Sequence, residues 1–163
     1  MAGRAEERQQ SEGDPGTADV VLTASRALLA IVARSVAPAL EVVSLPQFRV
    51  LVLLSTDGPT RVGSLAEHVG ANPSTFSRSV DRMVAAGWVV RTGNPESRRE
   101  VLLELTDDGR WLVESVTARR RREIETVLER MPPSQRAALV RALRSFSEAA
   151  GEASVGDLLT LGL

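Results

Sequence analysis

Apolar residues recur along most of the chain at the spacing of an α-helix, and proline and glycine divide them into short segments. Residues 1–16 are polar and end in the turn-forming run Gly13–Gly16, which is typical of a disordered tail. From about Thr17 to Ala37 apolar residues return at helical spacing without glycine or proline between them. This pattern predicts a first helix, which Pro38 ends or kinks.

Capping signals predict three further helices. Ser44 and Gln47 fit a capping box in front of a largely apolar segment that ends at residues 57–59, Asp-Gly-Pro. A short helix is expected over residues 62–69, with Gly70 as its left-handed cap. The next helix begins at once, with Asn72 as N-cap and Pro73 in the first position, and Gly87 ends it.

The pattern then changes from helix to strand and back to helix. Two β-prone stretches, residues 88–91 and 100–105, flank a polar tip and predict a hairpin. Thr106, followed by two aspartates, predicts the start of a long helix that runs to about Met131. A last helix is expected over about residues 134–150, after a Pro-Pro break. The predicted fold is mainly α with a small β-hairpin wing.

Two short helices followed by a hairpin indicate a winged helix-turn-helix, in which the second helix is expected to carry a DNA-facing surface. With Phe76 at the centre of the buried face, Val80 and Met83 fall within about 40° of it. The opposite face and its flanks carry hydroxyls, arginines and one carboxylate: Ser74, Thr75, Ser77, Arg78, Asp81 and Arg82. Hydroxyls suit phosphates or bases, and arginine suits guanine. The alternative is an ordinary solvated face. Asp81 counts slightly against DNA binding, unless it pairs with Arg78 or Arg82 and holds that arginine in position.

The tip of the predicted hairpin adds two more cations, Arg98 and Arg99. Arginine on a wing can enter the narrow minor groove of DNA, where the negative potential is enhanced. The alternative is a charged turn that only keeps the hairpin solvated. Together, the helix surface and the wing favour DNA binding more than either does alone.

Composition narrows the choice of function. The chain has 163 residues, no cysteine and a single histidine, His68, which disfavours a disulfide framework, a thiol switch or a metal site. No nucleophile with a base partner and no glycine-rich phosphate loop is evident, so an enzyme is not expected, nor a cofactor. No secretion signal or membrane-spanning segment is evident, which predicts a cytoplasmic protein. The net charge is −1, but all 20 basic residues are arginine, and a DNA-binding surface needs only a local excess of them.

Four segments, residues 44–51, 64–70, 77–87 and 94–109, together resemble the multiple-antibiotic-resistance regulator (MarR) family of bacterial transcription factors. The resemblance covers roughly residues 18–150, in order and with similar spacing. It implies a homodimer built from the first, fifth and sixth predicted helices. Each subunit would then present one winged lobe to half of a pseudopalindromic operator in double-stranded DNA. Many proteins of this kind are repressors released by small aromatic or phenolic ligands, usually bound between the dimer interface and the lobe.

The resemblance and the helical pattern together predict a domain organisation. Residues 44–106 would form the DNA-binding lobe, and residues 17–43 and 107–163 the helical dimerisation region. The late helices carry apolar stripes that one small lobe cannot cover, and a two-fold dimer is the commonest way to bury them. These stripes comprise Ile124, Val127, Leu128 and Met131 in one helix, and Leu139, Leu143 and Phe146 in the next.

The wing departs from the family pattern at one position. That pattern is aspartate, any residue, arginine, five residues, then leucine and threonine. Leu105, Thr106 and Arg99 match it, but Ser97 stands where aspartate is usual. A serine can offer only a neutral hydrogen bond, so Arg99 is expected to be less well ordered and DNA binding weaker.

Two other features are expected to be ordinary surface. The run Arg119–Arg122 points around all sides of a helix and has glutamates nearby, which favours a solvated, ion-paired segment over a nucleic-acid patch. His68 is expected to lie on the surface beside a helix end rather than to act as a ligand or pH sensor. Two alternatives to the main hypothesis remain: a winged-helix module that binds protein instead of DNA, and a DNA binder without an effector. The pattern does not identify a ligand pocket.

Overall fold

The computed structural model describes residues 16–94 and 97–151, with the backbone alone for residues 97–99. Helices dominate this part of the chain, and a small antiparallel sheet interrupts them. In chain order the elements are α2 (Thr17–Val36), the 3-10 helix η1 (Ala39–Glu41), α3 (Leu45–Asp57), β1 (Thr60–Arg61), α4 (Val62–His68), α5 (Pro73–Ala85), β2 (Val89–Asn94), β3 (Ser97–Leu105), α6 (Asp107–Glu129) and α7 (Pro133–Ala150).

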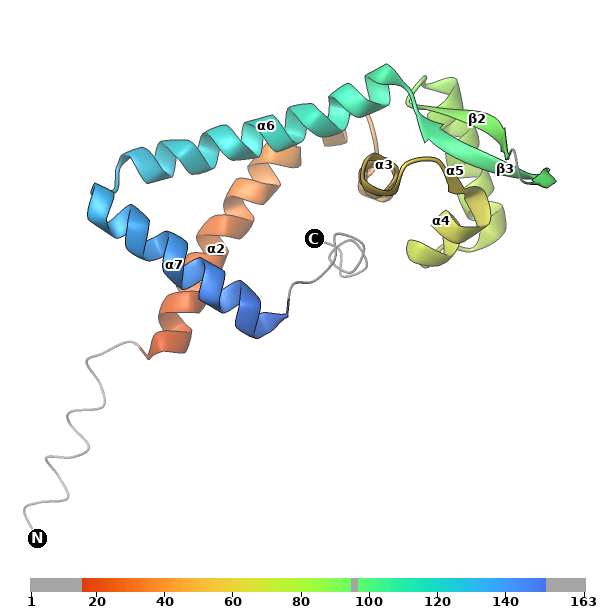
Figure 1. Ribbon diagram of the computed structural model, residues 1–163. Coiled ribbons are helices and arrows are strands. Elements are labelled where there is room, and N and C mark those ends of the chain that lie inside the picture. Colours follow the sequence, from red (N-terminus) through yellow and green to blue (C-terminus); the bar gives the residue numbers. More distant parts are fainter. Residues whose placement is uncertain (1–15, 95–96, 152–163) are drawn as a thin grey trace, which may run out of the picture.

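The elements form two regions joined by the long helix α6 (Figure 1). Helices α3, α4 and α5 gather with the sheet at one end, and α6 leads away from this lobe to a turn, from which α7 runs back. Helix α2 packs against α6. The predicted fold, mainly α with a β-hairpin wing on a helix-turn-helix, is confirmed. The predicted tail over residues 1–16 lies almost wholly outside the described residues.

The predicted helix starts are confirmed by their capping hydrogen bonds. Ser44 and Gln47 form a complete capping box, with the Ser44 backbone N–H donating to Gln47 Oε1 at 2.9 Å. The Asn72 side chain accepts from the backbone N–H of Ser74, and the Thr106 hydroxyl accepts from that of Gly109. These residues identify where each helix begins, because an N-cap side chain accepts hydrogen bonds from backbone N–H groups that the first turn leaves without a partner.

One apolar core holds the lobe together and extends under the first turns of α6. The residues that are almost fully buried come from α3, α4, α5, both hairpin strands and α6; the largest of them are Val50, Leu51, Leu65, Val80, Met83, Val89 and Leu103. Each lobe helix therefore has one face locked into a shared core, and only its outer face is available for binding.

The sheet contains a strand that the sequence pattern did not reveal. Its order is β1-β3-β2, all antiparallel, with Thr60 opposite Leu103 and Arg61 opposite Leu102. Strand β1 has only two residues, too few for an alternating pattern to be visible. It matters for the fold because it ties the segment before α4 to the base of the wing.

A glycine allows the lobe to join α6 closely. A Cβ atom at Gly109 would lie 2.1 Å from the backbone oxygen of Trp88, so no larger residue fits without movement. Around this contact the Thr106 hydroxyl donates to the Gly87 carbonyl at 2.6 Å, and the Thr106 N–H donates to the Trp88 carbonyl at 3.2 Å. The end of α5, the start of the wing and the start of α6 thus meet in one tight junction.

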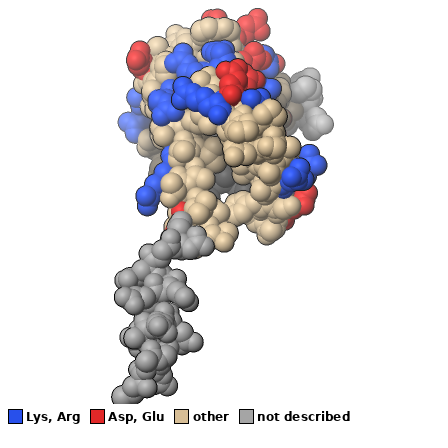
Figure 2. Space-filling view, turned by 90° about the vertical axis from the view of Figure 1, so that its left-hand side faces the viewer, with Lys and Arg blue, Asp and Glu red and all other residues tan. Residues whose placement is uncertain are grey.

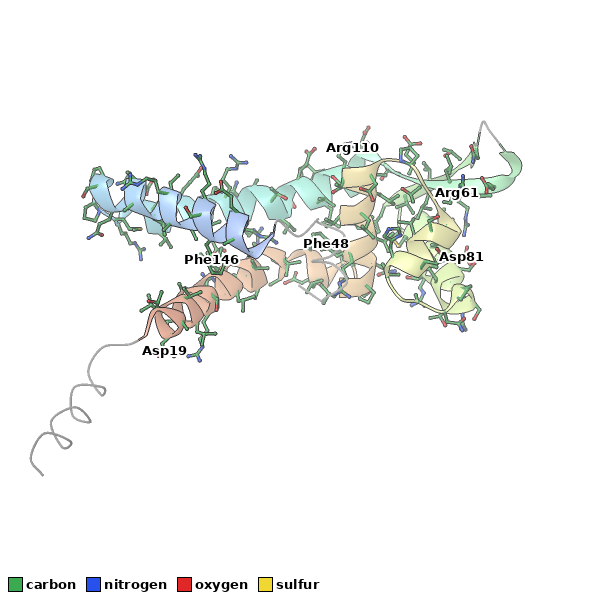
Figure 3. All side chains as sticks on the ribbon, turned by 60° about the horizontal axis from the view of Figure 1, so that its bottom comes forward. Asp19, Phe48, Arg61, Asp81, Arg110 and Phe146 are labelled. Atoms are coloured by element: carbon green, nitrogen blue, oxygen red, sulfur yellow. The ribbon has the colours of Figure 1, made fainter. Side chains whose placement is uncertain are left out.

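Helices α2 and α7 leave much of their apolar surface uncovered. No residue of α7 is buried, and in α2 only Ile31 and Ser35 are. Phe146 is 55% exposed and lies in the helical region, away from the lobe (Figure 3). Figure 2 views the molecule from the end opposite the lobe: side chains of both charges gather in the upper part, while much of the lower part carries no charge. The predicted stripe on α7 therefore exists, and nothing within the described chain covers it.

The expectation for Arg119–Arg122 was only partly right. Arg121 and Arg122 are exposed, but none of the four arginines forms an ion pair within the described part of the chain. The expected partner Glu123 instead pairs with Arg34 of α2 at 2.9 Å. Arg120 lies half-buried and donates to the Ser35 hydroxyl at 3.3 Å. Glu123 and Arg120 bond to residues of α2 because α2 packs against α6. The sequence pattern of one helix cannot show contacts with another helix.

Candidate nucleic-acid interface

Helices α4 and α5 form the helix-turn-helix, and local sequence determines the turn between them. Gly70 adopts a φ of 62°, the left-handed conformation that glycine accepts without strain. The Ala71 N–H donates to the Ala66 carbonyl at 2.9 Å and closes the turn. Asn72 and Pro73 then begin α5 immediately. The direction of α5 is therefore set by residues that lie directly before it.

The outer face of α5 is the surface that the sequence assigned to DNA. Phe76, Val80 and Met83 are buried, at 4%, 0% and 0% exposure, as predicted for the inner face. All five candidate residues lie on the other side and are exposed: Ser74, Thr75, Ser77, Arg78 and Arg82. The structure thus brings these five candidates together on one accessible face.

Most polar groups on this face have no competing partner inside the lobe. Thr75 and Ser77 make no side-chain hydrogen bond within the described residues, whereas the Ser74 hydroxyl bonds to Asn72 Oδ1 at 2.8 Å. Arg78 and Arg82 form no ion pair there, and Arg82 Nε makes one long bond, 3.4 Å, to the Arg78 carbonyl. The two guanidinium groups are therefore available to an external anion or base.

The one carboxylate of α5, Asp81, has a partner that the sequence did not suggest. Arg91 Nη2 of strand β2 donates to Asp81 Oδ1 at 2.6 Å, so Asp81 pairs with neither Arg78 nor Arg82, the two partners that the sequence offered. The pair joins the outer side of α5 to the base of the wing. It also neutralises a charge that would repel phosphate.

The wing arginines extend the same end of the lobe. Arg98 and Arg99 belong to strand β3, whose residues Val101 to Leu105 pair with β2 up to the junction with α6. Their side chains lie outside the described residues, so their direction stays a prediction from the sequence. The register shift at Gly93 and Asn94 marks the outer part of the hairpin.

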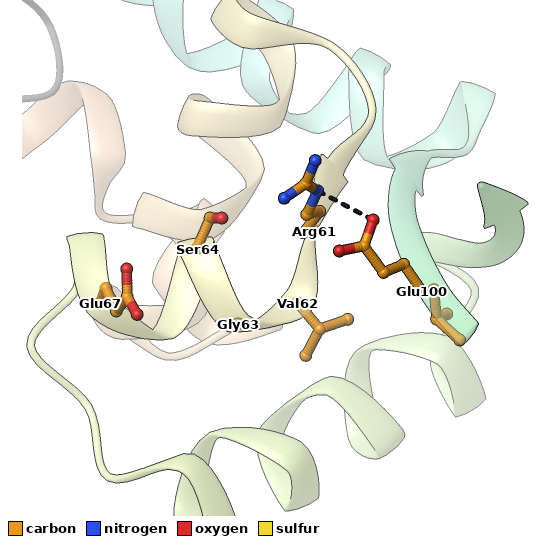
Figure 4. Close-up of a pocket in the computed structure, with 7 residues that line it drawn as sticks. Arg61, Val62, Gly63, Ser64, Glu67 and Glu100 are labelled. Carbon is orange, nitrogen blue, oxygen red and sulfur yellow. Dashed lines mark ion pairs between the residues drawn. The ribbon is translucent and has the colours of Figure 1, made fainter. Parts of the chain in front are cut away.

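Two shallow hollows border α4, one beside the wing and the other between α4 and α5. The larger, about 470 Å³, is bordered by residues of α4 and β3 together with the ion pair of Arg61 Nε and Glu100 Oε2 at 3.2 Å (Figure 4). Glu100 also accepts from Asn94 at 2.8 Å. The smaller, about 280 Å³, has mainly small and apolar walls that include Phe76. Arg61 and Glu100 in the larger hollow pair with each other, and Glu67 is its other charged residue.

The described part of the chain offers no group of three or more metal-ligating side chains. Within the same part, no helix is long and apolar enough to cross a membrane. His68 is exposed at the end of α4, with Nδ1 2.8 Å from the Ser64 carbonyl oxygen, as expected for a surface residue.

Comparison with known proteins gives this architecture a family. The MarR family model matches residues 43–101, which run from the start of α3 into the wing. The crystal structure of Rv1404 from Mycobacterium tuberculosis shares 49% identity, covers 83% of this chain and 92% of that one, and superposes with a TM-score of 0.72. The chain belongs to the MarR family. The resemblance seen in four sequence segments is thereby confirmed, and this is a family of transcription regulators rather than of enzymes.

Two other relatives of this MarR-family chain are informative. The HTH-type transcriptional regulator YfiV of Bacillus subtilis is 30% identical over 106 residues, which are 65% of this chain and 66% of YfiV. The MarR family protein Rv2887 of Mycobacterium tuberculosis, solved in complex with salicylic acid, is 25% identical and has a TM-score of 0.51; the match covers 82% of this chain and 98% of that one. The chain spans about half the length of the other curated relatives that it matches.

Proposed function

We propose that this MarR-family protein is a dimeric, sequence-specific DNA-binding regulator of transcription. In this proposal α5 enters the major groove and contacts DNA through Ser74, Thr75, Ser77, Arg78 and Arg82, and the wing reaches phosphate or the minor groove through Arg98 and Arg99. The observation that carries the proposal is the electrostatics of α5. Two exposed arginines form no ion pair within the described residues, while the single carboxylate of the helix is neutralised by Arg91.

Residues 44–106 are the proposed DNA-binding lobe, and residues 17–43 and 107–163 the proposed dimerisation region. The exposed apolar side chains of α2 and α7 support this division, because a single chain leaves them in water. They include Val20, Leu22, Leu28 and Leu29 of α2, and Val140, Leu143 and Phe146 of α7, each 47–56% exposed. A two-fold pair of chains would bury both sets at once.

We infer that the dimer acts as a repressor in the cytoplasm and leaves its operator when a small organic ligand binds. A dimer seated on an operator near a promoter excludes other proteins from the same DNA. The salicylic acid bound by the related protein Rv2887 supports a small organic acid as the class of ligand.

Footprinting of the purified protein on the DNA upstream of its own gene tests the proposal. We expect two protected half-sites centred about 10 base pairs apart, or a multiple of that distance, because two recognition helices related by two-fold symmetry reach successive major grooves. Binding should also fall steeply with salt. A single asymmetric footprint would exclude the two-fold dimer on DNA. The absence of any salt-dependent DNA affinity would instead favour the protein-binding alternative.

A further inference from the structure

Asp81 lies on the side of α5 that is turned away from the core, although it is the only acidic residue of that helix. At 100° per residue it stands about 140° from Phe76, between Ser77 at about 100° and Arg78 at about 200°. Ser77 and Arg78 come four and three residues earlier, so both are its neighbours on the helix surface. The Asp81 side chain is 58% exposed. A carboxylate therefore stands within the row of hydroxyls and arginines that is proposed to face DNA.

The pair with Arg91 explains how a carboxylate can occupy this position. Arg91 Nη2 donates to Asp81 Oδ1 at 2.6 Å. The positive charge of Arg91 offsets the repulsion between an isolated carboxylate and the DNA phosphates. The pair also restricts the rotation of the Asp81 side chain, because Arg91 comes from β2, where it lies opposite Leu103 in the sheet. The carboxylate is thus neutralised and held in one orientation.

Only one oxygen atom of this carboxylate is engaged. The bond from Arg91 goes to Oδ1, and Oδ2 makes no hydrogen bond or ion pair within the described residues. An ionised carboxylate accepts hydrogen bonds at both oxygen atoms, whereas the neighbouring Arg78 can only donate. This face of α5 therefore presents an acceptor next to donors, and the two can recognise different base edges.

The chemistry of DNA limits what such an acceptor can bind. Phosphate oxygens only accept hydrogen bonds, and the deoxyribose units within a strand have no donor, so the backbone offers Asp81 nothing. In the major groove the donors are the exocyclic amino groups, N4 of cytosine and N6 of adenine. Guanine and thymine present oxygen atoms at the corresponding edge, which would face the carboxylate without a hydrogen bond. A carboxylate on a DNA-facing helix therefore favours a base that carries an amino group.

We propose that Asp81 is a specificity-determining residue, whose Oδ2 accepts a hydrogen bond from an exocyclic amino group in the major groove. Arg91 is the residue that positions it. The proposal rests on the proposed function, in which α5 is the recognition helix, and adds the chemistry of the base that is read at one position per half-site. It also disfavours guanine and thymine at that position, because the carboxylate would be left desolvated and unpaired beside them.

Binding-site selection from randomised double-stranded DNA, carried out with the full chain, tests this assignment. The parent should select cytosine or adenine at one position per half-site, and the selected base shows which amino group is read. Asp81→Ala should lose that preference and keep the preferences at the other positions, including the one that depends on Arg78. Glu125→Ala removes an exposed carboxylate from α6 and is the matched control, which should select the same bases as the parent.

A double-mutant cycle on one selected operator then isolates the hydrogen bond itself. The amino group is deleted from the selected base, with 2-pyrimidinone in place of cytosine or purine in place of adenine. The parent should lose roughly 10-fold in affinity, the loss expected for one base contact. Asp81→Ala should bind the two duplexes almost equally, since it has no acceptor to lose.

Two variants of Arg91 test its positioning role. Arg91→Met leaves Asp81 charged and free to turn, so it should bind every sequence more weakly and discriminate less at the same position. Arg91→Lys keeps the charge without the fork and should recover part of both effects. Melting temperatures should stay close to that of the parent, because both side chains of the pair are well exposed.

Three results would overturn the assignment. One is Asp81→Ala selecting the same bases as the parent at every position. Another is an equal loss of affinity for the parent and Asp81→Ala when the amino group is deleted. The third, discrimination by Arg91→Met as strong as that of the parent, would remove the positioning role of Arg91. A parent that selects no sequence at all would instead refute the proposed function.

Discussion

Replacing Gly109 with alanine should destabilise the lobe through a single methyl group. The new Cβ would lie 2.1 Å from the Trp88 carbonyl oxygen and 3.1 Å from Leu105 Cδ2. The Trp88 oxygen belongs to the backbone, so relief requires the chain to move by about 1 Å in a closely packed region. Gly109 itself is buried, which leaves the methyl group no route into solvent.

The expected cost of Gly109→Ala is the balance of three effects. Overpacking of this kind costs about 1–3 kcal/mol. Weakening the bond from the Thr106 N–H to the Trp88 carbonyl, now 3.2 Å, adds about 1 kcal/mol. The better helix propensity of alanine returns about 0.5–1 kcal/mol. The free energy of unfolding should therefore fall by about 2 kcal/mol in total.

Urea unfolding of Gly109→Ala beside Gly63→Ala measures this effect. Gly63 lies in α4 of the same lobe, and its added Cβ would meet no atom within 4 Å. The control should therefore be neutral or more stable by up to about 1 kcal/mol. Operator affinity of Gly109→Ala should also fall, since the displaced turn holds the end of α5 through Thr106 and Gly87. Equal urea midpoints for Gly109→Ala and the parent would refute the close contact.

Three further substitutions test other parts of the account. Asp81→Asn removes the pair with Arg91. Because both side chains are well exposed, the free energy of unfolding should change by less than about 1 kcal/mol. In filter binding at fixed salt, the affinity for scrambled DNA should rise relative to that for operator DNA. Phe146→Glu places a charge on the uncovered face of α7, and light scattering at micromolar concentration should show monomers where the parent shows dimers; a dimeric variant would argue against this face as the interface. Ser97→Asp, which restores the usual family residue, should tighten operator binding in the same filter assay, and unchanged affinity would mean that wing order is not limiting.

Local rules predicted most of the fold. Ser44, Asn72 and Thr106 marked helix starts because an N-cap acts within three residues of itself, and each is seen to cap its helix. Gly70 and Gly87 marked helix ends for a similar reason, and both adopt positive φ. The exposed face of α5 followed from helical periodicity once Phe76 was placed inside.

Contacts between distant segments were not predictable in this way. Strand β1 exists because β3, some forty residues later, pairs with it. Asp81 pairs with an arginine on the next element, and Glu123 with one 89 residues earlier. The sequence alone does not show that position 109 requires glycine, because the requirement comes from the backbone oxygen of Trp88, which packs against it. Each of these features depends on which distant segments of the chain come into contact in the fold, and a single sequence does not show these contacts.

The most direct test of the central claim is the affinity of Arg78→Ala for operator and scrambled DNA at several salt concentrations. Arg78 is exposed on the outer face of α5 and makes no ion pair within the described chain. If it reads a base, the variant should lose about 1–3 kcal/mol of operator affinity and relax sequence preference at one position per half-site. Arg99→Ala should weaken binding more evenly and lower the salt slope by about one per subunit. The control Arg121→Ala should match the parent. If Arg78→Ala and Arg99→Ala both bound like the parent at every salt concentration, α5 and the wing would not be the DNA-binding surface.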